Sequence, residues 1–204
     1  MTKIFLLIGL TFSLVVGGYL FYIAKTTNVA DLQNALKATT IIYDKDGNQA
    51  GSLTGQKGTY VELDAISENL QNAVVATEDR SFYKNSGINY GRFFLAILTA
   101  GRSGGGSTIT QQLAKNAYLS QDQTVERKAK EFFLALEINK KYSKQEILTM
   151  YLNNAYFGNG VWGIEDASKK YFGVSASELT LDQSAVLAGM LKGPEIYNPL
   201  YSVE

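Results

Sequence analysis

The chain contains no cysteine among its 204 residues, which excludes disulfides, thiolate nucleophiles and cysteine zinc sites. It also contains no histidine, the usual general base and the commonest ligand of transition metals. A Ser-His-Asp hydrolase is therefore excluded, and any acid–base chemistry must use Asp, Glu, Lys or Tyr. A bound metal would have to be a hard ion such as Mg²⁺, held by carboxylates and phosphate oxygens.

An excess of charge is absent too, because 19 Lys and Arg residues balance 19 Asp and Glu residues. The net charge therefore gives no reason to expect a nucleic acid as a partner. Hydrophobic residues make up 46% of the chain and charged residues 19%, which is a globular composition. A chain of this length can bury the core of one domain of ordinary size.

A long uncharged run occupies residues 4–24, between Lys3 and Lys25. A helix needs about 20 mostly apolar residues to cross a bilayer, so this run is long enough. We therefore expect a transmembrane anchor at residues 1–25 and a polar stalk at residues 26–38. A cleaved signal peptide is the alternative, but it requires an A-x-A site, and none occurs near the end of the run. Aromatic residues gather toward the outer end, as is typical of a membrane interface: Tyr19, Phe21 and Tyr22.

The remainder, residues 39–204, predicts a mainly α domain that starts with a short β-hairpin. Thr39–Tyr43 and Gln49–Leu53 are β-rich runs on either side of an Asp-Gly turn. A helix is expected over Thr124–Lys141, with one apolar stripe that we interpret as core packing: Val125, Ala129, Phe132, Phe133 and Leu136. Two further helix starts are predicted by pairs with capping-box spacing: Ser143 with Glu146, and Thr180 with Gln183.

Three segments are candidates for chemistry, and the first runs from Glu78 to Gly87 after an apolar spacing that indicates a helix. It opens with an acid–acid–base sequence, which is usually a solvated helix end, and a catalytic Glu78 is the sharper alternative. Its Ser81-x-x-Lys84 pattern matches a motif of penicillin-binding transpeptidases. No K-T-G sequence accompanies that pattern, so we reject the match.

The second segment, Gly101–Asn116, is a Gly-rich run that leads into a helix. Such a loop can bind an anion through its backbone N–H groups. Ser107 stands where a phosphate-binding P-loop needs Lys, so nucleotide binding is not expected. A flexible loop and an anion site assisted by Lys115 both stay open. The apolar patch Phe93–Leu98 just upstream belongs either to the core or to a membrane-contacting surface.

The third segment is Arg127-Lys128-Ala129-Lys130-Glu131, within the expected long helix. Arg127 and Glu131 are four residues apart and therefore share one face of that helix. A generic helix ion pair explains this spacing adequately, so the residues alone make the segment a candidate and no more.

Five segments together resemble the motifs of the family 51 glycosyltransferases, in the same order. This family comprises the glycosyltransferase modules of class A penicillin-binding proteins and the monofunctional transglycosylases, and the chain is similar to its bifunctional streptococcal members. The resemblance covers Thr39 to Tyr201. The matching segments are ATEDRSFYKNSG (76–87), GGGSTITQQLAKN (104–116), RKAKE (127–131), YLNNAYFG (151–158), and AGMLKGP (188–194) with YNP (197–199).

The resemblance implies a lysozyme-like helical lobe with a small membrane-facing jaw, which would include Phe93–Leu98. The implied activity is polymerisation of lipid II into β-1,4-linked glycan strands, with release of undecaprenyl pyrophosphate. Glu78 would be the general base that takes the proton from the acceptor 4-hydroxyl, in a displacement with inversion. Glu131 would be the second essential carboxylate, beside the donor pyrophosphate and a divalent cation, Mg²⁺ or Mn²⁺.

The same resemblance implies a set of residues that bind the substrate and its pyrophosphate: Arg80, Ser107, Gln112, Lys115, Asn116 and Arg127. Cations suit this leaving group because negative charge develops on its oxygens as the bond breaks. The implied partners are lipid II, the lipid-linked nascent glycan, the cell membrane, and other cell-wall synthesis and division proteins. The implied location is the cell membrane, with one span and the catalytic domain on the extracytoplasmic side.

Two positions depart from the family pattern. Asn85 stands where many members have His, which we expect to remove a local polar contact without affecting catalysis. Gln123 stands where many members have Arg, and Lys128 or Lys130 is the candidate to supply the missing cation.

Two other functions stay open: a membrane-tethered, lysozyme-like hydrolase of peptidoglycan with the same carboxylates, and a non-catalytic cell-wall scaffold. Lys115, Arg127 and the anchor count against the hydrolase, and the retained Glu78 and Glu131 count against the scaffold. The chain ends at Glu204, soon after the fifth motif. We therefore expect the domain at 39–204 to be truncated at its C-terminus, and no transpeptidase domain lies within this chain.

Overall fold

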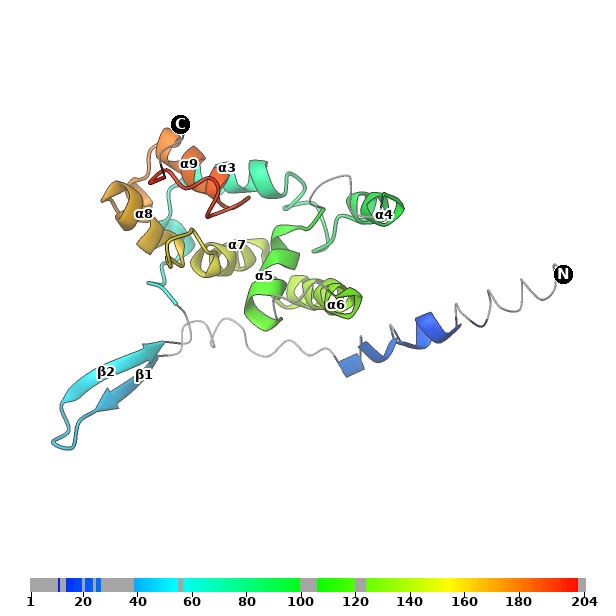
Figure 1. Cartoon of the computed structure of the whole chain (residues 1–204), viewed down its shortest axis with the longest axis horizontal. Helices are drawn as coiled ribbons and strands as arrows, with labels where there is room; N and C mark the ends of the chain where they lie inside the picture. Colours follow the sequence, from blue (N-terminus) through cyan, green and yellow to red (C-terminus); the bar gives the residue numbers. More distant parts are fainter. Residues whose placement is uncertain are drawn as a thin grey trace.

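The computed structural model describes residues 11, 14–19, 21–23, 25–26, 39–54, 57–99, 106–119 and 124–201. Within these residues the chain is mainly helical, as expected (Figure 1). The 3₁₀ helices among them are η1 (Leu63–Ala65) and η2 (Ala176–Glu178). The α-helices of the body are α3 (Glu68–Glu78), α4 (Tyr90–Leu98), α5 (Ile109–Tyr118), α6 (Val125–Lys141), α7 (Lys144–Asn154), α8 (Ile164–Phe172) and α9 (Leu181–Met190).

The predicted anchor at residues 1–25 lies largely outside the described residues. Residues 14–19 and 21–23 are helical, and Ile23 is buried while neighbouring apolar side chains such as Phe21 are exposed. Across the part of the chain that the structure describes, no helix combines the length and the apolar character needed to span a bilayer. The predicted stalk at 26–38 falls outside the described residues, apart from Thr26.

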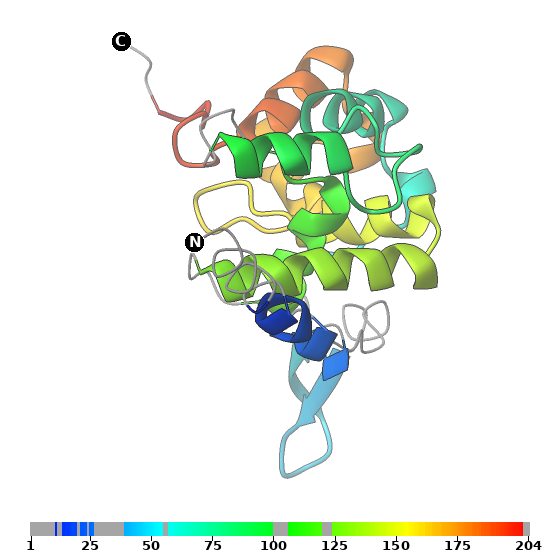
Figure 2. The same cartoon turned by 90° about the vertical axis from the view of Figure 1, so that its right-hand side faces the viewer.

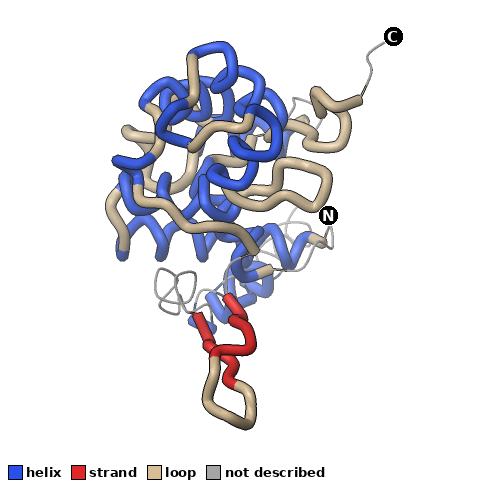
Figure 3. Tube along the Cα trace, turned by 90° about the vertical axis from the view of Figure 1, so that its left-hand side faces the viewer, coloured by secondary structure: helices blue, strands red, loops and turns tan. Residues whose placement is uncertain are grey.

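A β-hairpin precedes the helical body. Its strands are β1 (Thr39–Tyr43) and β2 (Gln49–Thr54), which pair antiparallel, and β2 ends one residue later than the predicted run. Asp44 organises the turn between them, because its Oδ1 accepts the N–H groups of Asp46 and Asn48, both at 2.9 Å. The hairpin projects away from the helices (Figure 3), so it does not take part in the candidate site.

The core of the helical body is centred on α7, in which every residue of Ile147–Asn153 is buried. Helix α5 packs against α6 and α7, and α3 packs against α9. Figure 2 shows α4 and α6 at the front of the body, with α5 between them. Helix α5, which carries the end of the second candidate segment, therefore packs against α6, which carries the third.

Capping residues mark where several of these helices begin. Both predicted capping boxes are confirmed, at the starts of α7 and α9. A further box, which was not predicted, caps α5. There Thr108 Oγ1 accepts the N–H of Gln111 at 3.1 Å, and Gln111 Oε1 accepts the N–H of Thr108 at 3.0 Å.

The stripe predicted along α6 is not the buried face of that helix, and this prediction was wrong. The stripe residues whose side chains are described are only partly buried: Ala129, Phe132, Phe133 and Leu136. Phe132 contacts α4 instead, with its ring centroid 5.0 Å from that of Phe93. The buried residues of α6 include a carboxylate, which a hydrophobic pattern does not count: Glu131, Leu134, Ala135 and Ile138.

Candidate active site

Glu78 is the last residue of α3, and its side chain is partly buried. Gln112 on α5 donates a hydrogen bond from Nε2 to Glu78 Oε2 at 2.7 Å. Glu78 Oε1 accepts no hydrogen bond from any other residue that the structure describes. The carboxylate is therefore held at one oxygen and can offer the other to a ligand.

The next residue, Asp79, connects the end of α3 to the start of α5. Its side chain is only 1% exposed and accepts hydrogen bonds from Ser81 Oγ at 2.9 Å and from Asn85 Nδ2 at 2.9 Å. Its Oδ2 also accepts the backbone N–H of Ile109, the first residue of α5, at 3.4 Å. Because a buried carboxylate needs several donors, these contacts fix the position of this chain segment.

Asn85 makes several polar contacts of its own, so the expected loss of a polar contact at this position is not observed. Besides its bonds to Asp79, Asn85 accepts the Nζ–H of Lys144 at 3.1 Å and the N–H of Gly87 at 3.0 Å. Burial lowers the pKa of Lys144, and the charge of Asp79 acts in the opposite direction. The amide of Asn85 therefore bridges a buried acid and a partly buried base.

An anion site at the start of α5 was one of two alternatives for the Gly-rich segment, and three of the backbone N–H groups there have partners within the protein. The N–H of Thr108 goes to Gln111, that of Ile109 to Asp79, and that of Gln111 to Thr108. Residues 101–105 of the Gly-rich loop lie outside the described residues. These contacts occupy three N–H groups of this helix start, and the anion site assisted by Lys115 stays a prediction.

Glu131 on α6 is 1% exposed and lies between two cations. Arg127 Nη1 donates to Glu131 Oε2 at 2.8 Å, and Lys128 Nζ donates to Oε1 at 2.6 Å. Lys128 Nζ also donates to Ser107 Oγ at 3.0 Å, which joins α6 to the segment before α5. The pairing holds both cations in place, because the buried carboxylate cannot lose either partner without a desolvation cost.

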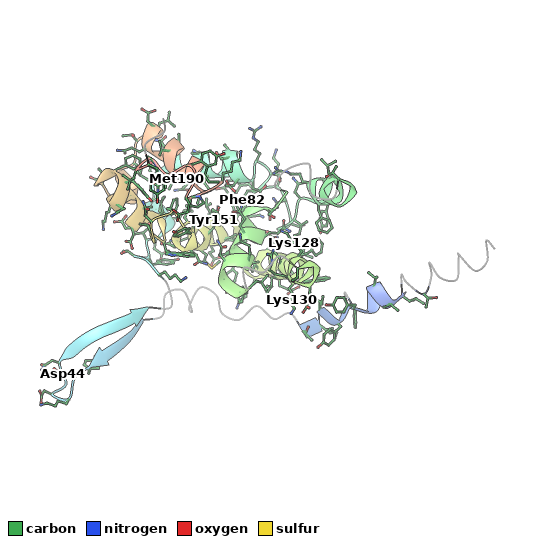
Figure 4. All side chains as sticks on the ribbon, viewed as in Figure 1. Asp44, Phe82, Lys128, Lys130, Tyr151 and Met190 are labelled. Carbon is green, nitrogen blue, oxygen red and sulfur yellow. The ribbon has the colours of Figure 1, made fainter. Side chains whose placement is uncertain are left out.

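Lys128 and Lys130 point to different sides of α6 (Figure 4). Lys130 pairs with Glu126 at 2.7 Å and lines a pocket beside the N-terminal helical residues Tyr19 and Tyr22. Of the two lysines suggested to compensate for Gln123, only Lys128 therefore reaches Glu131 and Ser107.

The remaining predicted binding residues differ in their surroundings. Lys115 and Asn116 lie on α5 three and four residues after Gln112, and so on the same face. Their side chains form no ion pair or hydrogen bond with the other described residues. Arg80 is exposed and donates from Nε to the carbonyl of Ala76 at 3.1 Å, so its side chain turns back onto the last turn of α3.

Comparisons with known proteins identify the domain. Residues 46–204 match the transglycosylase family. This chain belongs to the transglycosylase family. The transglycosylase match begins within the hairpin turn and includes Glu78, Glu131 and every other predicted site residue.

Relatives of this transglycosylase domain carry the name penicillin-binding protein. Penicillin-binding protein 2a of Streptococcus pneumoniae is 80% identical over 204 residues, which are 100% of this chain and 28% of the relative. Penicillin-binding protein 1A of Aquifex aeolicus is 41% identical over 207 residues, covering 97% of this chain and 28% of the relative. Penicillin-binding protein 1A/1B of Bacillus subtilis is 40% identical, covering 91% and 21%. The chain thus spans about a quarter of these relatives.

Among the residues that the structure describes, the predicted divalent cation finds no complete set of ligands. Both oxygens of Glu131 accept hydrogen bonds from cationic side chains. Over the residues that the structure describes, no group of three or more acidic side chains could hold a metal. These residues do not fit a metal bound by the protein alone, so Mg²⁺ or Mn²⁺ stays a prediction and no step below uses it.

Sequence reasoning gave no role to Asp79 or Lys144, and none to the close packing at Gly87. Gly87 has φ +93°, and its carbonyl accepts the Thr108 hydroxyl at 2.6 Å. The only sequence feature that could have indicated a role for Asp79 is its position next to Glu78. The acid–acid–base sequence that contains both residues was interpreted as a solvated helix end. Lys144 had no such feature, because its partner Asn85 is 59 positions away along the chain.

Proposed function

We propose that this transglycosylase domain is a peptidoglycan glycosyltransferase that polymerises lipid II into β-1,4-linked glycan strands. The observation that supports it most is the carboxylate of Glu78, which Gln112 holds at Oε2 and which is open at Oε1 among the described residues. A general base must direct a lone pair at the proton that it removes. A carboxylate fixed at one oxygen meets that requirement.

In the proposed reaction, Glu78 Oε1 takes the proton of the acceptor 4-hydroxyl. The oxygen of this hydroxyl attacks the anomeric carbon of the growing chain at the same time. The bond between this carbon and the pyrophosphate oxygen breaks, and its electron pair leaves on undecaprenyl pyrophosphate. Attack from the opposite side inverts the configuration and gives the β-1,4 link. Glu78 then loses the proton to solvent, and the glycan on the acceptor lipid is longer.

The leaving group in this scheme is stabilised by cations and does not need a protonated acid, unlike that of a lysozyme-type hydrolase. Lys115 and Arg127 are the proposed cations, with Gln112, Asn116, Ser107 and Arg80 as further contacts. Glu131 contributes by holding Arg127 and Lys128, at 2.8 Å and 2.6 Å. Two cations beside one carboxylate leave a net positive charge at this end of α6.

The finer fold and the location belong to the same proposal. We place the helices in a lysozyme-like lobe, with α4 in a membrane-facing jaw and residues 1–25 as a single-pass membrane anchor. The domain would then act on the extracytoplasmic side, where its lipid-linked substrates share the membrane with it. Because the relatives are penicillin-binding proteins, we propose that this transglycosylase domain also belongs to a penicillin-binding protein. Its proposed partners are cell-wall synthesis and division proteins.

Incubating the full chain in detergent with labelled lipid II, and separately with finished peptidoglycan, tests the function. The expected result is a ladder of glycan products, with one undecaprenyl pyrophosphate released for each glycosidic bond formed. New reducing ends from finished peptidoglycan, without polymer from lipid II, would show a hydrolase instead. Binding of lipid II with neither product would show a scaffold.

A further inference from the structure

The phenol of Tyr151 on α7 completes a chain of hydrogen bonds that ends at Glu78. Tyr151 O–H donates to Gln112 Oε1 at 3.1 Å, and Gln112 Nε2 donates to Glu78 Oε2 at 2.7 Å. The chain crosses three helices, since Tyr151 lies on α7, Gln112 on α5 and Glu78 on α3. Tyr151 lies in the interior of the helical body (Figure 4), with 2% of its surface exposed.

Burial, and then the negative charge of Glu78, raise the pKa of the Tyr151 phenol well above its ordinary value. The phenol therefore keeps its proton at any pH at which the protein would work. A primary amide has an acceptor end and a donor end, and either end can face a neighbour. With a protonated phenol on one side and an ionised carboxylate on the other, only one orientation avoids placing two acceptors together.

From this arrangement we infer that Tyr151 is a positioning residue, whose hydroxyl fixes the Gln112 amide so that it holds Glu78 Oε2 and directs Oε1 toward the acceptor hydroxyl. The inference rests on the proposed function, in which Glu78 is the general base. Tyr151 does not touch substrate in this scheme. It acts on the rate through Gln112 alone, and this distinguishes it from an ordinary core residue.

The test substitution is Tyr151→Phe, which removes only the hydroxyl and keeps the ring in the core. Tyr171→Phe is the matched control, because its hydroxyl also donates to a protein acceptor, the Phe157 carbonyl at 2.7 Å, but not to Gln112. Both variants of the full chain are compared in detergent for thermal midpoint, for lipid II binding and for polymerisation at saturating lipid II. Tyr151→Phe should lower kcat about tenfold and leave lipid II affinity within twofold, while Tyr171→Phe retains kcat.

Coupling to Gln112 separates positioning from a structural role. In a Gln112→Ala background, Tyr151→Phe should cause no further loss of kcat, because residues that act in series are not additive. An unchanged kcat in Tyr151→Phe overturns the inference. Equal, independent losses in both backgrounds also overturn it, since they would indicate a general packing effect.

A readout without catalysis keeps this inference separate from the proposed function. The side-chain amide resonances of Gln112, assigned by their absence in Gln112→Ala, report its two hydrogen bonds by NMR. They should move toward the positions of a solvated amide in Tyr151→Phe and stay in place in Tyr171→Phe. Unmoved resonances in Tyr151→Phe refute the positioning, whereas a wild-type chain that makes no polymer refutes the proposed function.

Discussion

Asp79 Oδ2 lies 3.4 Å from the backbone nitrogen of Ile109, a residue 30 positions further along the chain. The contact ties the residue after Glu78 to the first residue of α5, three positions before Gln112. The distance between Glu78 and Gln112 therefore depends on a buried neighbour that meets no substrate in the proposed reaction.

Replacing this carboxylate by an amide should weaken both the fold and the site. Asp79→Asn places an NH₂ group among donors from Ser81, Asn85 and Ile109, so we expect a loss of roughly 1–3 kcal/mol in the free energy of unfolding. Urea titration followed by circular dichroism measures it. Asp64→Asn is the control, because Asp64 is exposed. An equal effect of both substitutions would show that Asp79 does not have the role described.

Close packing at Gly87 predicts a second destabilising change. A Cβ on Gly87 would lie 2.6 Å from the Ala135 carbonyl oxygen, at a φ of +93°. Gly160 has a φ of +74°, but no atom lies within 4 Å of its Cβ position. Gly160→Ala should therefore cost about 1 kcal/mol from backbone strain alone, and Gly87→Ala at least about 2 kcal/mol more. Similar losses of stability in the two variants would contradict the close approach of the Gly87 backbone to α6.

The two lysines of the third motif should differ in their effect on activity. Lys128→Ala removes a partner of the buried Glu131 and should reduce polymerisation of lipid II about five- to twentyfold. Lys130→Ala breaks only a solvent-screened pair with Glu126 and should leave the rate within twofold. Initial rates at several lipid II concentrations test this, and a larger loss in Lys130→Ala would reverse the assignment.

Stability at high pH should depend on Tyr151. Its pKa is raised in the folded state, so the unfolded chain loses this proton first, as pH rises through about 10. The stabilising contribution is therefore complete below pH 10 and declines above it. Urea titrations at pH 9 and pH 11 should show wild type losing more stability than Tyr151→Phe. If the difference in the free energy of unfolding between the two proteins stays constant with pH, this result argues against burial of the phenol.

Local signals in the sequence predicted the helix starts well. Ser143 with Glu146 and Thr180 with Gln183 have a spacing that acts within one turn, and both pairs form the expected caps. Thr108 and Gln111 have the same capping-box spacing, but this pair was not predicted as a cap. It lies next to the Gly-rich loop, and that segment was considered as an anion site instead.

Contacts between distant residues could not be predicted in this way. Glu78 and Gln112 were both singled out, yet nothing in their spacing indicates that they touch. The buried face of α6 was also misplaced, because its stripe of aromatic residues packs against α4 while Glu131 is buried with two cations. A charged side chain that is buried with its partners cannot be told from a solvated one by hydrophobic periodicity.

The most direct measurement of the central claim compares wild type with Glu78→Gln for lipid II binding and for polymer formation. Gln keeps the size of the side chain and its contact with Gln112. Its amide is not a base, however, and cannot take the proton of the 4-hydroxyl as the carboxylate does. We predict lipid II affinity within about threefold of wild type and a loss of polymer of at least about a thousandfold. Polymer formation at more than about a tenth of the wild-type rate would contradict Glu78 as the general base.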